Sequence, residues 1–166
     1  MAAGDVTVFN RFTELLGGEG AIHDLGADTF LMGIITNTTP LQTAVEPRWI
    51  ASGNPDFSAL ETLATGGNYT ADGEPLSTTI TDNWSITGAV STFAGDNISI
   101  LTHASNPTGT GTSSAYWGII YNSTSVTKEC VAFVDLGGPV DMTLGDFTIT
   151  WDGAGGAANA IFTLTN

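Results

Sequence analysis

The feature that most constrains this chain is a strict alternation of large apolar and polar residues near its C-terminus. Phe147, Ile149 and Trp151 alternate with Asp and Thr. Successive side chains of a strand point to opposite faces, so this period of two predicts a half-buried β-strand. A connector rich in Gly and Ala follows, and residues 160–165 form a second β-prone run. The two runs together predict a terminal hairpin.

Short β-prone runs of this kind recur along the chain. Residues 30–36 and 116–121 are apolar at both odd and even positions, which is typical of strands covered on both faces. Residues 126–136 predict a further strand, which we expect Gly137, Gly138 and Pro139 to end. The spacing of the runs is typical of sandwiches and jelly rolls. We therefore predict an all-β fold, a two-sheet β-sandwich or jelly-roll-like domain.

One short segment, residues 7–16, has a helical pattern instead. Phe9 and Phe12 begin a stripe of apolar residues spaced three and four apart, and Gly17 and Gly18 provide a stop. We expect this N-terminal helix either to cover an end of the sheets or to dock onto a partner. A length of 166 residues suits one domain, so residues 1–166 are assigned to a single β domain.

Residues 38–75 form the least regular part of the sequence, with several prolines and glycines. A long loop inside a compact domain is usually functional, or an excursion onto a neighbouring molecule. Arg48 and Trp49 lie within it, and arginine and tryptophan are enriched among residues that anchor interfaces. The alternative is that Trp49 packs over the core of its own domain. The first interpretation predicts an interface formed by Phe9, Phe12, Arg48, Trp49 and Ile50.

The charge of the chain excludes several classes of partner. Three Lys and Arg residues against 17 Asp and Glu residues give a formal net charge of −14. Such a surface repels phosphate backbones and anionic lipid head groups, so we expect no nucleic-acid binding and no membrane binding. The single cysteine, Cys130, excludes an internal disulfide. It lies in an apolar run, which favours a buried, unreactive thiol.

Catalytic motifs are absent from the sequence: it has no nucleophile elbow, phosphate-binding loop or zinc motif. His23 and Asp24 are adjacent, but neighbours in a strand or loop usually point apart. We therefore predict that the chain is not an enzyme and has no cofactor and no metal site. A glycosidase-like pair of carboxylates remains formally open, with the candidate acids Asp135, Asp141, Asp146 and Asp152.

Five stretches of the sequence, taken in order, resemble a group of small structural proteins of tailed bacteriophages. They are FNRFTELLGG, IHDLGADTFLMGIITNTTP, GGNYTADGEPLS, WGIIYN, and GDFTITWDGAG followed by FTLTN. The group is identified as capsid decoration, or cement, proteins. The resemblance implies a sandwich-type homotrimer that stands on the outer surface of the virion capsid. It also implies the major capsid protein as the partner, and it implies no catalytic residues.

The resemblance therefore predicts a virion structural protein that binds neighbouring capsid subunits and stabilises the shell. Two other functions remain open. One is a tail or head-fibre component that binds the host surface, which would be present in far fewer copies per particle. The other is a carbohydrate-binding or glycosidase-like β-sandwich, which sugar binding would reveal.

Overall fold

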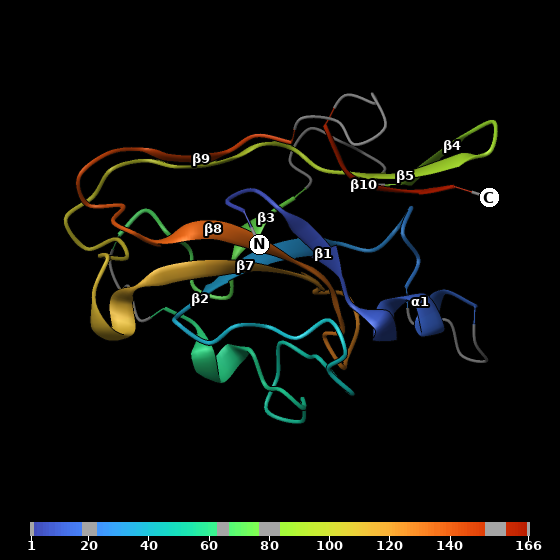
Figure 1. Cartoon of the computed structure of the whole chain (residues 1–166), viewed down its shortest axis with the longest axis horizontal. Helices are drawn as coiled ribbons and strands as arrows, with labels where there is room; N and C mark the ends of the chain where they lie inside the picture. The colour runs from blue at the N-terminus through green and yellow to red at the C-terminus, as the bar shows by residue number, and fades with distance from the viewer. Residues whose placement is uncertain (1, 18–22, 63–66, 77–83, 152–158, 166) are drawn as a thin grey trace.

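The computed structural model describes residues 2–17, 23–62, 67–76, 84–151 and 159–165. These residues form antiparallel sheets in two layers, together with one α-helix (Figure 1). The all-β, sandwich-like fold predicted from the sequence is thereby confirmed. No helix among the described residues has the length and apolar character that a membrane span requires.

The central sheet has five strands in the order β1-β8-β7-β2-β3. Its strands β2 and β7 are buried along almost their whole length, because both of their faces are covered. Their apolar runs at odd and even positions are the sequence counterpart of this burial. The five strands are β1 (Val6–Val8), β2 (Phe30–Ile35), β3 (Glu74–Pro75), β7 (Ala115–Asn122) and β8 (Cys130–Val140).

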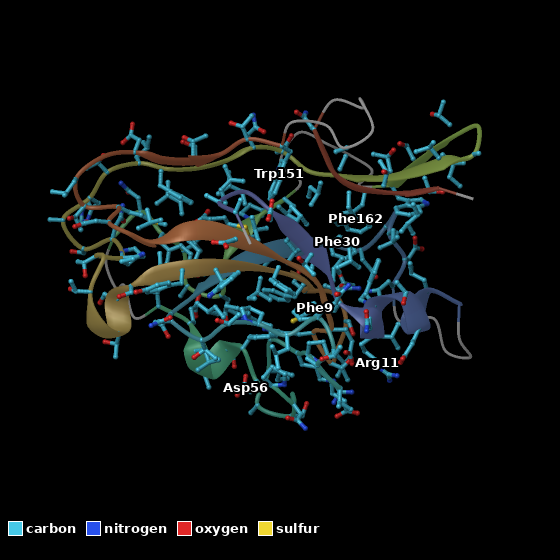
Figure 2. The ribbon with its side chains drawn as sticks, in the orientation of Figure 1. Phe9, Arg11, Phe30, Asp56, Trp151 and Phe162 are labelled. Atoms are coloured by element: carbon cyan, nitrogen blue, oxygen red, sulfur yellow. The ribbon has the colours of Figure 1, made fainter. Side chains whose placement is uncertain are left out.

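The second layer lies above the central sheet in Figure 1 and consists of two smaller sheets. One has the order β10-β5-β4 and the other pairs β6 with β9. Between the layers, the ring centroids of Phe30 and Phe93 are 5.1 Å apart. Within the second layer, Phe93 stacks on Phe162 at the same centroid distance, and Figure 2 labels Phe30 and Phe162. The strands of this layer are β4 (Trp84–Thr87), β5 (Val90–Ala94), β6 (Ile98–Ile100), β9 (Phe147–Ile149) and β10 (Ala160–Thr165).

The predicted terminal hairpin is wrong, because β9 and β10 do not pair with each other. β9 pairs with β6, with Ile149 opposite Ile98, and β10 pairs with β5, with Phe162 opposite Phe93. Strands β5 and β6 follow one another in the chain, as β9 and β10 do. The consecutive strands β5 and β6 thus pair with β10 and β9, respectively. The alternation identified the strand correctly, and Trp151 just beyond it is buried.

The helix α1 spans Asn10–Gly17 rather than residues 7–16. Thr7 and Val8 belong to β1, where Thr7 lies opposite Phe133 of β8. This part of the chain is rich in β-branched residues, which favour a strand when a sheet edge is available. Because Phe9 and Phe12 have a helical spacing, the predicted helix began three residues before the observed one.

Strand β8 also differs from its prediction, since it begins at Cys130 and continues to Val140. Gly137, Gly138 and Pro139 do not end it. The register between β7 and β8 shifts between Ala115 and Trp117, and Gly137 has a φ of 69°. An irregularity of this kind lets a strand contain residues that would break a regular ladder.

Residues 38–62 lie below the central sheet, on the face opposite the second layer, and α1 lies at the right-hand end of the sheets (Figure 1). Their regular structure is limited to isolated bridges and one 3₁₀ turn at Ser58–Leu60. Phe57 packs on Phe9, and Phe9 packs on Phe133 of β8, with centroid distances of 5.8 and 5.1 Å. This irregular segment thus covers the sheet of its own chain, which was one of the two roles that the sequence left open for the region around Trp49.

Candidate binding surface

Trp49 lies inside the irregular segment that covers the central sheet. It is almost fully buried, and its indole stacks on the Tyr121 ring at a centroid distance of 5.1 Å and an interplanar angle of 3°. The indole N–H donates to Asp72 Oδ1 at 3.3 Å. Gly33 of β2 provides the space, because a Cβ atom there would overlap the indole ring. Trp49 therefore has the core position that was the alternative prediction.

The predicted interface is not a surface patch. Phe9, Phe12 and Trp49 are buried within this chain, so they are not available to a partner. Phe12 contacts His23 and Phe162 instead. Arg48 and Ile50 are only half-buried. An amphipathic helix and a tryptophan in a loop can either bind a partner or cover a sheet of their own chain. The sequence alone does not distinguish these two roles.

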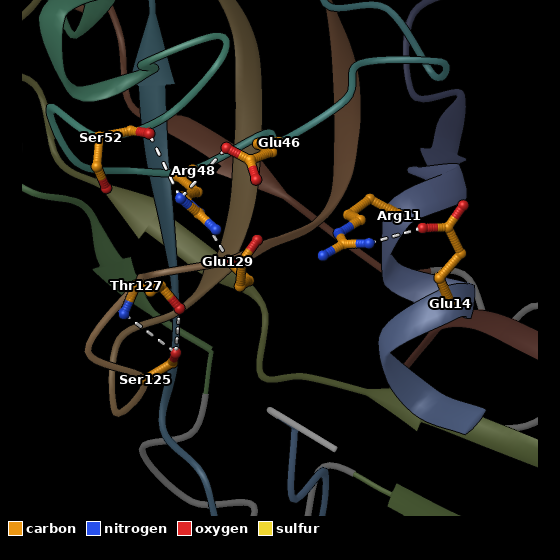
Figure 3. Close-up of polar contacts among 8 residues, drawn as sticks. All are labelled: Arg11, Glu14, Glu46, Arg48, Ser52, Ser125, Thr127 and Glu129. Carbon is orange, nitrogen blue, oxygen red and sulfur yellow. Dashed lines mark hydrogen bonds and ion pairs between the residues drawn. The ribbon is translucent and has the colours of Figure 1, made fainter. Parts of the chain in front are cut away.

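Arg48 fixes the irregular segment to the β7–β8 connection (Figure 3). Its Nε donates to Glu129 Oε1 at 2.7 Å, and its Nη1 lies 3.5 Å from Glu46 Oε2. The side chain of Glu129 is fully buried, and its Oε2 has no partner among the described residues. Next to this ion pair, the backbone N–H of Trp49 donates to the carbonyl of Lys128 at 2.9 Å. These contacts make the segment a fixed part of the domain.

An open groove of about 380 Å³ lies on the outside of this segment. Leu41 and Val45 in its wall are 63% and 71% exposed. Exposed apolar side chains that line a concave surface are characteristic of binding sites. The apolar residues of the groove are Pro40, Leu41, Ala44, Val45, Pro55 and Phe57.

A second hollow of about 270 Å³ continues the groove towards α1. It shares Thr43, Ala44 and Val45 with the groove and reaches Arg11 and Glu14. Arg11 Nη1 is paired with Glu14 Oε2 at 2.8 Å. We refer to the groove and the hollow together as the trough. Sequence reasoning missed it. The available signal was that Leu41 and Val45 are isolated apolar residues among threonines and prolines.

His23 contacts a group of hydrogen-bonded residues that supports the local fold. Asn122 Nδ2 lies 3.2 Å from its Nδ1 and donates to Asp28 Oδ2 at 2.6 Å. Asn122 Oδ1 accepts hydrogen bonds from the backbone N–H groups of Thr124 and Ser125. His23 therefore helps to hold the turn between β7 and β8. Its burial lowers its pKa to about 4, and the negative charge of Asp28 opposes this shift.

The buried His23 should make the protein less stable in acid. Its pKa is lower in the folded chain than in the unfolded chain, so the unfolded chain binds more protons between pH 6.5 and about 4. The contribution of His23 to stability is complete above pH 6.5 and is lost as the pH falls towards 4. The loss should reach about 3 kcal/mol. We expect urea titrations across this range to show a smaller pH dependence for His23→Gln. Parallel curves for the wild type and the variant would contradict this expectation.

The candidate acids support local structure rather than converge on a cleft. Asp135 accepts from the N–H of Gly137, and Asp141 accepts from Thr143. Asp146 accepts two bonds of 2.7 Å from Thr102. These hydrogen bonds lower the pKa of Asp141 and Asp146. Asp152 lies outside the described residues. No group of three potential metal ligands occurs in the described part of the chain.

A second polar cluster lies near β3. Glu61 Oε1 accepts from the hydroxyl of Tyr69 at 2.7 Å and from the N–H of Asp72 at 2.8 Å. Burial raises the pKa of Glu61. The Tyr69 hydroxyl also accepts from the N–H of Ile34 on β2. The cluster thereby links the end of the irregular segment to the central sheet. Elsewhere in the fold, Cys130 is buried and unpaired as expected, and burial raises the pKa of its thiol.

Comparison of the chain with protein-family models, with curated proteins and with solved structures gives no match. A binding role for this chain is therefore argued from the trough, its surroundings and the charge of the chain.

Proposed function

We propose that this chain is a virion structural protein, a capsid decoration or cement protein that binds the outer surface of the major capsid shell. In this role it would act as a homotrimer and stabilise the shell by bridging neighbouring capsid subunits. The observation that carries the proposal is the trough, a solvent-open apolar surface whose walls include Leu41 and Val45. The resemblance described above supports the identity of the partner.

The way the trough is supported also favours a binding function. The irregular segment that forms it is fixed to the sandwich by the buried Trp49 and by the Arg48–Glu129 ion pair. A surface that is rigid before binding loses little conformational entropy when it docks. The charge of −14 favours the solubility of the free protein. Exposed ion pairs are weak and are screened by salt, so apolar contacts should dominate attachment.

The test is to locate the chain on purified particles and to weaken the trough. Electron microscopy should show many copies distributed over the outside of the shell. Replacing both Leu41 and Val45 with serine should lower the number of bound copies about tenfold or more, because the apolar wall is lost. Leu144→Ser is the matched control, since Leu144 is 83% exposed and is not part of the trough. Circular dichroism should confirm that both variants are folded.

Three results would contradict the proposal. They are location of the chain at the tail only, full occupancy by the folded Leu41→Ser/Val45→Ser variant, and release of the wild type by molar salt alone. Location at the tail would favour the fibre component instead.

A further inference from the structure

The trough consists of two hollows that share the lining residues Thr43, Ala44 and Val45. One end has the apolar groove around Leu41, and the other reaches Arg11 and Glu14 on α1. A small ligand is usually enclosed on most sides, whereas an extended polypeptide lies along an open groove. The shape therefore suits a length of chain.

The backbone of the trough offers further contacts. The N–H groups of Leu41, Thr43 and Val45 donate to no acceptor in the part of the chain that the structure describes. In recognition of extended segments, main-chain hydrogen bonds provide affinity and apolar pockets for side chains provide specificity. The residues that line the trough thus have both main-chain donors without an acceptor in the described structure and exposed apolar side chains, which are the two kinds of group that this mode uses.

The charge around the trough is negative. The side chains of Glu14 and Glu46 are 64% and 42% exposed. Glu14 pairs with Arg11, and Glu46 and the buried Glu129 both pair with Arg48, so three carboxylates and two guanidinium groups leave a formal net charge of −1 here. With −14 on the whole chain, a partner segment with positive charge is attracted and an acidic one is repelled. A second copy of this chain contains only three Lys and Arg residues, so it fits poorly as the occupant.

We infer that the trough binds an extended polypeptide segment whose apolar side chains are flanked by lysine or arginine. This inference rests on the proposed function only for the source of the segment, which would be the major capsid protein. The apolar side chains contact Leu41 and Val45, the exposed apolar residues of the trough. The basic flanks lie near Glu14 and Glu46.

The inference can be tested without particles by using two fluorescein-labelled peptides and the whole chain. Both peptides have a core of alternating leucine and valine; one has two lysines at each end and the other has two glutamates. In fluorescence anisotropy at low salt, the lysine-flanked peptide should bind about tenfold more tightly or better. Molar salt should reduce this difference. Glu46→Gln should reduce this difference in affinity as well, because it removes the exposed acid that follows Val45 in the chain.

The Leu41→Ser/Val45→Ser variant should bind the lysine-flanked peptide about tenfold more weakly, and Leu144→Ser should bind like the wild type. Equal affinity for the two peptides, unchanged binding by the double variant, or no binding of the lysine-flanked peptide would overturn the inference. Its failure can be distinguished from failure of the proposed function. Binding of the peptide without attachment to particles rejects only the function, and attachment without peptide binding rejects only this inference.

Discussion

Trp49→Ala should lower the free energy of unfolding by about 3–5 kcal/mol, the usual cost of removing a large buried aromatic side chain. The indole is 1% exposed, stacks on Tyr121 and fills the space above Gly33. Its removal would leave a cavity between the central sheet and the segment that covers it. A small domain is stable by only about 5–15 kcal/mol, so the variant should unfold at a much lower urea concentration.

Two further variants provide the controls for this measurement. Trp49→Phe should lose less stability, because a ring remains on Tyr121. Leu41→Ala should change the free energy of unfolding by less than about 0.5 kcal/mol, since Leu41 is exposed. A folded Trp49→Ala variant with wild-type stability would contradict the core position and would return Trp49 to the list of interface candidates.

Arg48→Ala should be almost as damaging, at about 3–5 kcal/mol, because it leaves the fully buried carboxylate of Glu129 without its partner. The Glu129 Oε2 already has no partner among the described residues, so the Arg48 Nε bond at 2.7 Å is the contact that compensates its burial. Urea denaturation of Arg48→Ala, measured beside the wild type, tests this expectation.

A double-mutant cycle measures the interaction energy between Arg48 and Glu129 separately from the contribution of each residue alone. Arg48→Leu combined with Glu129→Leu removes both charges and should recover much of the stability lost by either single variant. Arg11→Ala is the matched control, because its partner Glu14 is exposed and such pairs contribute about 1 kcal/mol or less. Additive losses for the two substitutions would show that Arg48 and Glu129 are not energetically coupled.

The fold class could be predicted because its signals are local. The apolar runs at residues 30–36 and 116–121 correspond to β2 and β7, and the alternation at Phe147 and Ile149 corresponds to β9. Strand pairing could not be predicted in the same way. The partner of β9 is β6, at Ile98–Ile100, and no local property of either strand selects the other.

The candidate site was harder to predict than the fold, for a similar reason. Whether Trp49 faces solvent or the sheet depends on Gly33 and Tyr121, which are distant from it in sequence. A tryptophan beside an arginine is as compatible with an interface as with a loop that packs over a sheet of its own chain. The trough depends on how the segment folds, which leaves Leu41 and Val45 exposed on its outside and buries Phe57 on its inner face.

The arrangement of the central sheet also has a consequence for how fast the protein folds. Strand β1 pairs with β8, so that Val6 lies opposite Val134. The chain between β1 and β8 forms a long loop, and closing it costs conformational entropy before the strand contacts form. Proteins with many such distant contacts fold in about milliseconds to seconds. During synthesis, β1 must wait until most of the chain has been made. Until it pairs, the β8 edge that β1 covers in the native sheet can bond to strands of other nascent chains.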